Sequence, residues 1–341
     1  NKLGKYMGLS SQFTVKFNNF SPIIGWANVD TIIITKAWIE LYPFKNWPGD
    51  STAFLDISVE QIAPDTALSW SNYLAAETVD SIWEFLSLNG ISLIQDTTVS
   101  ITDVVEIPIN LELLNQWRKN LILNNGLRFI SSEENENLMA AFYAYDHSLE
   151  YSPKLKIQCS VSDSSGILPA DTLVTLYSTG DLQYSENKYK PDFSQLILSQ
   201  GVVYMPWLKM PALRDTIPEN AIINKAFLAI EYDDNLSYFD ERSKIIQLKY
   251  LYSDNWESST ASIDIYLQNT SAVYDTAKNI VFDLSRIIQY YIAGGSRDAE
   301  ARFRFSFLDE QEGFSRIILD AASVRLDLYY TLMTTKPGEN E

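Results

Sequence analysis

The chain is poor in the residues from which most metal and redox sites are built. Its 341 residues include one cysteine, Cys159, and one histidine, His147. An intrachain disulfide is therefore excluded, and so are zinc sites with several cysteine or histidine ligands. Apolar runs such as residues 31–35 are far shorter than the ~20 residues that cross a bilayer as a helix. The phosphate-binding patterns GxGxxG and GxxxxGK[ST] are absent.

Positive charge is also scarce. The chain has 26 Lys and Arg against 44 Asp and Glu, so its formal charge is −18. An acidic surface repels phosphate backbones and anionic lipid headgroups, so we expect neither nucleic-acid binding nor direct membrane insertion. The hydrophobic fraction is 46% and the aromatic fraction 13%, which is enough to build a buried core.

Four blocks of sequence recur in the same order in the two halves of the chain. Aligning Lys36-Ala37 with Lys225-Ala226 begins the match, and three further pairs follow. These are 110–117 with 283–290, which places Trp117 on Tyr290, then 127–129 with 303–305, and 152–157 with 323–328. One matching block arises easily by chance, but four in order indicate a tandem duplication. The first copy is longer, and the surplus is expected within residues 63–90.

Most segments alternate apolar and polar residues or are rich in β-branched and aromatic residues, as strands are. We expect strands at 12–17, 31–41, 98–109, 154–161, 244–251, 262–267, 301–307 and 323–332. Two short helices are predicted, 111–120 behind an N-cap at Asn110 and 284–292 behind Asp283. The predicted fold is all-β, with two tandem antiparallel jelly-roll-like sandwiches that carry one short helix each.

The domain boundaries follow from the repeat and from composition. Residues 1–161 are expected to form the first sandwich and residues 173–334 the second. Residues 162–172 are rich in Ser, Asp, Gly and Pro, which is typical of a linker. Residues 335–341 read as a polar tail.

The first copy resembles DNRLRE-type domains. The resemblance rests on Ile107–Trp117, on the turn Asn124-Asn125-Gly126-Leu127 and on the strand Ser152–Ile157. Residues 37–42 (AWIELY) resemble the early strand of that family, and Trp256-Glu257-Ser258-Ser259 resembles its mid-domain segment. The match is clearer in the first half, because the second half lacks the Asn-Gly-Leu turn. The resemblance implies a jelly-roll sandwich of extracellular or surface proteins, of which some members are similar to carbohydrate-binding modules for acidic polysaccharide and others are spacers or surface decorations.

No catalytic constellation stands out. Because Asp146 and His147 are adjacent, they would point to opposite faces of a strand, so we interpret His147 as an exposed loop residue rather than a catalytic base. Cys159 falls in the last strand of the first copy and is predicted to be buried; as a nucleophile it would need a histidine partner. We therefore expect a protein that is not an enzyme.

Two kinds of binding site stay open. Asp233, Asp234 and Asn235 form an oxygen-rich loop that is either simply solvated or binds calcium, the one cofactor considered. Trp47 with Asp50, and Trp256 with Asp254, lie in polar segments, where an aromatic ring either closes a core or stacks on a sugar.

The leading hypothesis is a non-catalytic extracellular structural protein, a subunit of a cell-surface layer, sheath or filament. Its partners would be further copies of itself or other surface proteins. The N-terminal strand with Gln12, Thr14, Val15 and Phe17 either lies in its own sheet or completes a neighbour's. The alternative is a glycan-binding adhesion module that binds polysaccharide through loop aromatics. The chain starts at Asn1, which fits an exported protein whose signal peptide has been removed, or a trimmed chain.

Overall fold

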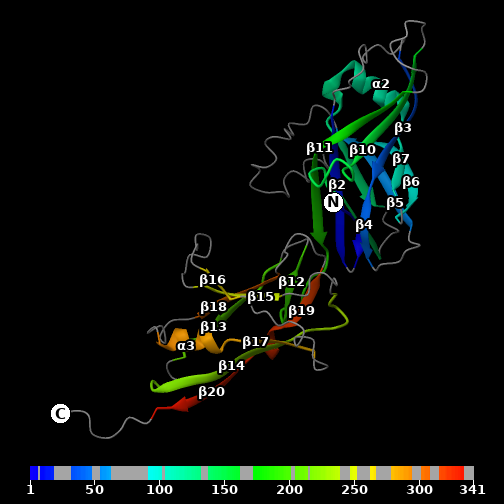
Figure 1. Cartoon of the computed structure of the whole chain (residues 1–341). Helices are drawn as coiled ribbons and strands as arrows, with labels where there is room; N and C mark the ends of the chain where they lie inside the picture. Colours follow the sequence, from blue (N-terminus) through cyan, green and yellow to red (C-terminus); the bar gives the residue numbers. More distant parts are fainter. Residues whose placement is uncertain are drawn as a thin grey trace, which may run out of the picture. The chain divides into compact units, whose positions relative to one another are not determined.

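The computed structural model describes residues 1–6, 8–18, 32–47, 54–62, 91–101, 104–131, 137–161, 172–200, 204–213, 216–238, 246–251, 262–265, 278–293, 301–307 and 315–333. The chain divides into two compact units, unit 1 (Asn1–Tyr189) and unit 2 (Lys190–Glu341). Within the described residues, both units consist of antiparallel sheets and each has one short α-helix (Figure 1). The predicted all-β class with two tandem units is confirmed.

Unit 1 has two layers of antiparallel strands around one core. One layer has the order β2-β8-β5-β6 and also includes β1, β9 and β4; the other has the order β11-β10-β3-β7. The strands are β1 (Lys2–Tyr6), β2 (Leu9–Phe17), β3 (Ile32–Leu41), β4 (Pro43–Trp47), β5 (Phe54–Ile62), β6 (Ile91–Ser100), β7 (Val105–Pro108), β8 (Leu127–Ser131), β9 (Leu138–Phe142), β10 (Lys154–Val161) and β11 (Thr172–Asn187). Inward-facing side chains such as Phe13, Ile39 and Phe129 alternate with more exposed ones, as expected for strands with one buried face.

Strand β11 belongs to both layers of unit 1. Its first part pairs with β10 and its second part with β2, and the register with β2 shifts between Ser178 and Gly180. A bulge bends a strand, and here it lets one strand pass from one layer to the other. As a result β11 covers the edges of both layers, and Figure 1 shows it as the long strand beside β10 and β2.

Unit 2 repeats the plan of unit 1. Its sheets have the orders β13-β18-β15-β16, β17-β14-β20 and β12-β19, which correspond to β2-β8-β5-β6, β7-β3-β10 and β1-β9. The strands are β12 (Gln195–Ser199), β13 (Trp207–Met210), β14 (Ala221–Glu231), β15 (Ile246–Leu251), β16 (Ser262–Ile265), β17 (Asn279–Asp283), β18 (Ala301–Phe307), β19 (Arg316–Asp320) and β20 (Arg325–Leu332). The sequence showed a correspondence between the two halves in four blocks only. The strand pairing shows that this correspondence covers almost every described element of the two units.

A shared irregularity supports this correspondence. The register between β3 and β10 skips Thr35, and the register between β14 and β20 skips Asn224. The sequence alignment on Lys36 and Lys225 places these two bulged residues at the same position. Bulges are specific features of a sheet, so a bulge at the same aligned position indicates one inherited plan.

The first α-helix starts where its cap predicts, and the second starts one residue later than predicted, at Ser285 rather than Leu284. The Asn110 side chain accepts a hydrogen bond from the Glu112 amide at the start of α2 (Leu111–Lys119), and Asp283 accepts one from the Ser285 amide at the start of α3 (Ser285–Ala293). Two short 3-10 turns, η2 (Leu121–Leu123) and η5 (Ala321–Ser323), accompany them.

The helix alignment made from the sequence is wrong by one residue. The buried positions of α2 are Leu113, Leu114, Trp117 and Arg118, and those of α3 are Ile287, Ile288, Tyr291 and Ile292. Tyr291, which is buried, therefore occupies the place of Trp117, whereas Tyr290 is exposed. Both residues are tyrosines, so the sequence alone did not distinguish them.

The predicted boundary between the domains also needs correction. Residues 162–171 lie outside the described residues, but β11, which was expected to open the second domain, pairs with strands of unit 1. Its side chains Val174 and Leu176 belong to the core of unit 1, so that unit extends to Tyr189 rather than to residue 161.

The length difference between the copies lies where it was predicted. Residues 63–90 connect β5 to β6, whereas only residues 252–261 connect the equivalent strands β15 and β16. Both connections lie outside the described residues.

Each unit has its own hydrophobic core. The buried cluster of unit 1 runs from Leu3 to Leu176 and includes Phe13, Phe129 and Trp117. The cluster of unit 2 runs from Leu198 to Leu319.

Candidate interaction surfaces

The edge of β10 shows how a strand closes the core in unit 1. Along this edge β11 sets Leu176 opposite Leu155 and Val174 opposite Ile157. All four side chains are buried in the core. The strand thus satisfies the backbone groups of β10 and also covers the apolar side chains between the two layers.

The same edge has no such cover in unit 2. No described strand pairs with the side of β20 that faces away from β14, and we call this side the β20 edge. Leu326 and Leu328, the counterparts of Leu155 and Ile157, pack against the core but are only half-buried. Tyr330 has an exposed fraction of 40%, whereas its counterpart Cys159 is fully buried. Within the described residues, the core of unit 2 is therefore open at the edge that β11 closes in unit 1.

Exposed apolar side chains gather around the β20 edge. Among the described residues these are Ile222, Tyr329, Tyr330, Leu332 and Met333. Ile222 belongs to β14, opposite Thr331 of β20. Clusters of exposed apolar side chains at a sheet edge are typical of association sites.

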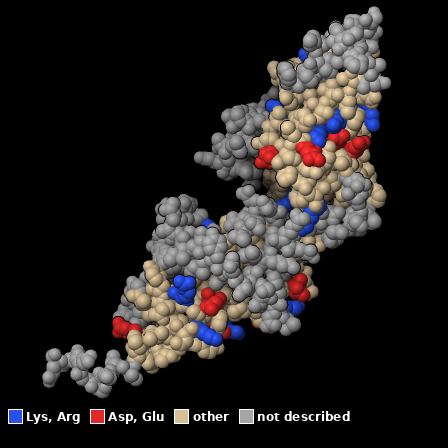
Figure 2. Space-filling model, in the orientation of Figure 1, with Lys and Arg blue, Asp and Glu red and all other residues tan. Residues whose placement is uncertain are grey.

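Strand β20 is electrically neutral although the chain is acidic. Its two charged residues are Arg325 and Asp327, and the Arg325 Nε lies 3.0 Å from a carboxylate oxygen of Asp327. On the face drawn in Figure 2, acidic and basic side chains of the described residues lie interspersed in both units. The net charge of −18 therefore does not prevent another strand from approaching this edge.

A second surface, in unit 1, consists of stacked rings. We call Tyr42, Phe44, Tyr143, His147 and Tyr151 the aromatic surface. Tyr143 lies at its centre, with ring centroids 4.4 Å from His147, 4.9 Å from Phe44 and 5.2 Å from Tyr151. Phe44 and Tyr151 are about 40% exposed, with fractions of 41% and 40%. Exposed rings of this kind are what sugar-binding sites use.

Charged groups adjoin the aromatic surface. The Tyr42 hydroxyl donates a hydrogen bond of 2.8 Å to Glu40 and accepts one of 3.0 Å from the Lys154 ammonium. Burial, followed by the hydrogen bond to Glu40, raises the pKa of Tyr42. Burial lowers the pKa of Lys154. A lysine and a carboxylate thus lie beside exposed rings, on the part of unit 1 where β3 and β10 pair.

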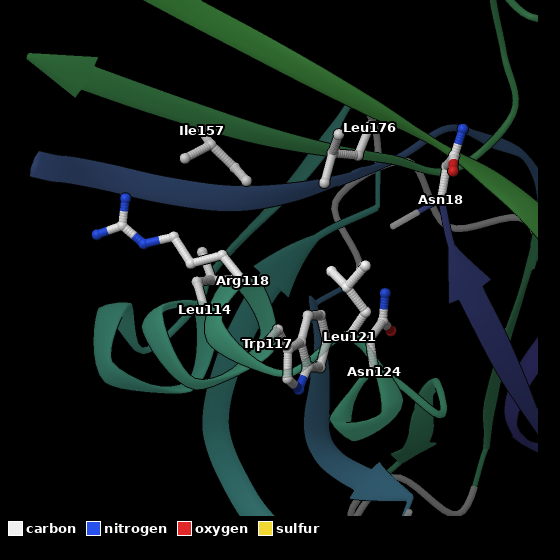
Figure 3. A pocket seen from close by; sticks show the side chains of 8 residues that line it. All are labelled: Asn18, Leu114, Trp117, Arg118, Leu121, Asn124, Ile157 and Leu176. Carbon is white, nitrogen blue, oxygen red and sulfur yellow. The ribbon is translucent and has the colours of Figure 1, made fainter. Parts of the chain in front are cut away.

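The cavity under helix α2 is part of the core. Leu114 and Trp117 of α2 face Ile157 of β10 and Leu176 of β11 across it (Figure 3). Its volume of about 20 Å³ holds about one water molecule. The guanidinium of Arg118 donates a 2.6 Å hydrogen bond to the carbonyl of Ile32, which indicates a structural role.

The predicted calcium loop lines an open pocket of about 410 Å³ in unit 2. The Asp233 carboxylate accepts hydrogen bonds from the amides of Asn235 and Leu236, and Asp234 pairs with Lys278 at 3.5 Å. Within the described residues, no group of three or more Asp, Glu, His or Cys side chains has a geometry that could hold a metal ion. The calcium site stays a prediction.

The predicted glycan residues fall largely outside the described part of the chain. Asp50, Asp254 and Trp256 lie outside it. The Trp47 backbone ends β4 opposite Met139, but its side chain is outside the description too. The glycan site at these four residues stays a prediction.

The N-terminal strand is paired on both sides within unit 1. Strand β2, which contains Gln12, Thr14, Val15 and Phe17, pairs with β11 on one side and with β1 and β8 on the other. Thr14, Val15 and Phe17 are buried, and Gln12 accepts hydrogen bonds from Arg128. Of the two alternatives for this strand, the structure has the one in which it lies in its own unit.

Two single-residue interpretations are borne out. Cys159 is a free, buried cysteine in β10, and His147 is exposed in the turn after β9. The sequence analysis missed that His147 stacks on Tyr143. The aromatic run at 142–151 was a usable signal, but its partners at 42–44 are far away in the sequence.

No protein-family model matches the chain, and a search of curated proteins found no relative. The resemblance to DNRLRE-type domains therefore stays a prediction. The described helices are all too short or too polar to span a membrane.

Proposed function

We propose that the protein is a non-catalytic structural subunit that assembles at the cell surface, in a layer, sheath or filament. The observation that carries this proposal is the open core of unit 2 at the β20 edge. An uncovered apolar edge lowers the stability of the single chain in water and favours the addition of another strand. We therefore expect such an edge in a protein whose edge is covered by a strand of another molecule.

The tandem plan supports the same proposal. Unit 1 uses β11 to complete its sandwich, whereas the described part of unit 2 has no equivalent strand. With unit 1 closed by β11 and the β20 edge uncovered by any described strand, there is a defined place for the next molecule, as subunits of ordered assemblies require.

Electron microscopy of the native material on its cells, together with light scattering of the purified chain, tests this function. Ordered layers or filaments that contain the chain would support it. A chain that is found dispersed and monomeric at high concentration, with and without calcium, would contradict it.

The second candidate function is glycan binding by the aromatic surface of unit 1. Exposed rings of Phe44 and Tyr151 beside Lys154 and Glu40 supply the stacking and polar groups that a sugar needs. Lys36 and Lys156 belong to the same pair of strands, β3 and β10, and provide local positive charge for an acidic polysaccharide.

A glycan array with the wild type and the Tyr151→Ala and Phe44→Ala variants tests the second candidate. We expect binding to be lost in both variants and kept in Tyr290→Ala, which removes an exposed ring of helix α3 in unit 2. Binding that survives in all three variants, or no binding by the wild type, would remove this candidate.

A further inference from the structure

We propose that the β20 edge of unit 2 pairs antiparallel with the β20 edge of a second copy of this chain, so that one strand of each copy completes the other copy's core. This inference rests on the proposed assembly function and specifies its first contact. It starts from the contrast between β10, which β11 covers, and β20, which no described strand covers on that side.

The alternation along β20 suits a copy of itself. Leu326, Leu328 and Tyr330 face inward, as Leu155, Ile157 and Cys159 do in β10, while Arg325, Asp327, Tyr329 and Thr331 lie on the other face. In an antiparallel pair about a two-fold axis, the inward faces of both strands lie on the same side. The second copy thus supplies apolar residues where unit 1 uses Val174 and Leu176.

The charges and the length of strand that can pair restrict the register. With the axis at Leu328, Leu326 lies opposite Tyr330, Arg325 opposite Thr331 and Asp327 opposite Tyr329 of the other copy. No like charges meet in this arrangement. With the axis at Asp327, two carboxylates would face each other, which is unfavourable. An axis at Leu326 would set Arg325 opposite Asp327, but it would extend the pairing over only residues 325–327 of β20. An axis at Leu328 pairs residues 325–331 of both copies, so we place the axis at Leu328.

The residues that follow β20 in the sequence, 334–341, are a poor substitute for this partner. Residues 334–341 (TTKPGENE) contain no large apolar side chain and have a proline, which lacks an amide proton for a sheet. By contrast, β20 has no proline and no inward-facing charge, which are the usual means of protecting an edge.

The first test compares two lysine substitutions by sedimentation equilibrium of the full chain. Tyr330→Lys places a charge at the β20 edge, and Val281→Lys places one on β17, the opposite edge strand of the same sheet. Both wild-type side chains are 40% exposed, so neither substitution disrupts a filled core.

We expect Tyr330→Lys to weaken dimerisation on the order of 100-fold, because a lysine would be buried opposite Leu326. Val281→Lys should dimerise as the wild type does, and circular dichroism should show the same fold for all three. Equal dimerisation of the two variants, or a monomeric wild type, would overturn the proposal.

The second test is cross-linking under mild oxidation. Chains with Arg325→Cys mixed with chains with Thr331→Cys should form a disulfide, because these residues lie opposite each other in the proposed register. Either variant alone places its cysteines on the order of 20 Å apart and should not cross-link. Cross-linking of single variants to the same extent, or none in a dimeric mixture, would contradict the register and the pairing.

The outcomes separate this inference from the function on which it rests. If native layers or filaments persist with Tyr330→Lys, assembly stands and the β20 contact is wrong. If the purified chain dimerises through β20 while no ordered assembly occurs on the cell, the contact stands and the structural function is wrong.

Discussion

Cys159 and Tyr330 occupy the same position in the two units, opposite Ile34 in β3 and Ile223 in β14, yet Cys159 is fully buried and Tyr330 is 40% exposed. The backbone pairing is equivalent, so the difference comes from what covers the strand. Strand β11 sets Thr172 opposite Cys159, whereas no described strand lies along Tyr330 on that side. Among the described residues, the presence or absence of one neighbouring strand thus decides whether this position is buried or exposed.

The buried thiol gives a direct measure of the integrity of unit 1. Burial raises the pKa of Cys159 to about 11, although nearby Arg118 opposes the shift. At pH 8 the thiolate fraction is then on the order of one in a thousand, and the side chain is inaccessible as well. We expect the native chain to react with a disulfide reagent at least ~100-fold more slowly than the chain unfolded in guanidinium. Complete labelling of the folded chain within seconds would contradict this burial.

Gly4 is required by the close approach of β1 to β9. Its φ is +124°, and a Cβ there would overlap the carbonyl oxygen of Leu138 and lie 2.9 Å from the Met139 Cα. Gly4→Ala should therefore destabilise unit 1 by about 1–3 kcal/mol, measured by urea unfolding. Ser10→Ala, in the hairpin partner strand β2, is the control and should change stability by less than ~0.5 kcal/mol. Similar losses in both variants would show that Gly4 has no special conformational role.

The sequence predicted the features that depend on local pattern. Strands β10 and β18 have their expected bounds, because alternating apolar residues define one buried face. Helix α2 begins behind Asn110 as its cap predicts and ends one residue before the expected end. The repeat was found because both copies keep the same apolar residues at paired positions, such as Ile39 and Leu228.

The features that the sequence did not predict depend on distant contacts. In β11 only Val174, Leu176, Ser178 and Leu182 are buried, so its second part has too few apolar residues to be recognised as a strand. It is held there by its pairing with β2, far away in the sequence. The aromatic surface was missed for the same reason, since Phe44 and Tyr143 meet only after β4 has paired with β9. The open edge of unit 2 emerges only from comparison of the two folded units.

Separate cores predict separate unfolding. In unit 1, Phe129 of β8 stacks on Phe13 with a distance of 4.8 Å between the ring centroids. In unit 2, the ring centroids of Phe305 of β18 and Phe282 are 5.6 Å apart. Both phenylalanines are buried, each in the cluster of its own unit. Phe129→Ala and Phe305→Ala should each cost about 3–5 kcal/mol, but in different calorimetric transitions. Limited proteolysis at a temperature between the two transitions assigns each transition to a unit. If either variant shifted both transitions equally, the two units would not unfold independently.

Glu60 should make the stability of unit 1 depend on pH in an unusual direction for a carboxylate. Burial raises its pKa above the ordinary value of 4.5, and Asp96 adds to the rise, while Arg128 at 3.5 Å opposes it. A raised folded-state pKa means that the folded chain binds the proton more tightly than the unfolded chain. The stabilising contribution of this group is therefore complete below the unfolded pKa and is lost as the pH rises through the folded pKa. Glu60→Gln removes this loss. When the pH rises from about 4 to about 7, the unfolding free energy of the variant should therefore increase more, or decrease less, than that of the wild type. Glu112→Gln, which removes an exposed carboxylate of α2, controls for the change in net charge. Denaturant unfolding of unit 1 at both pH values decides the matter: an identical pH dependence of the Glu60→Gln and Glu112→Gln variants would mean that burial does not set the protonation of Glu60.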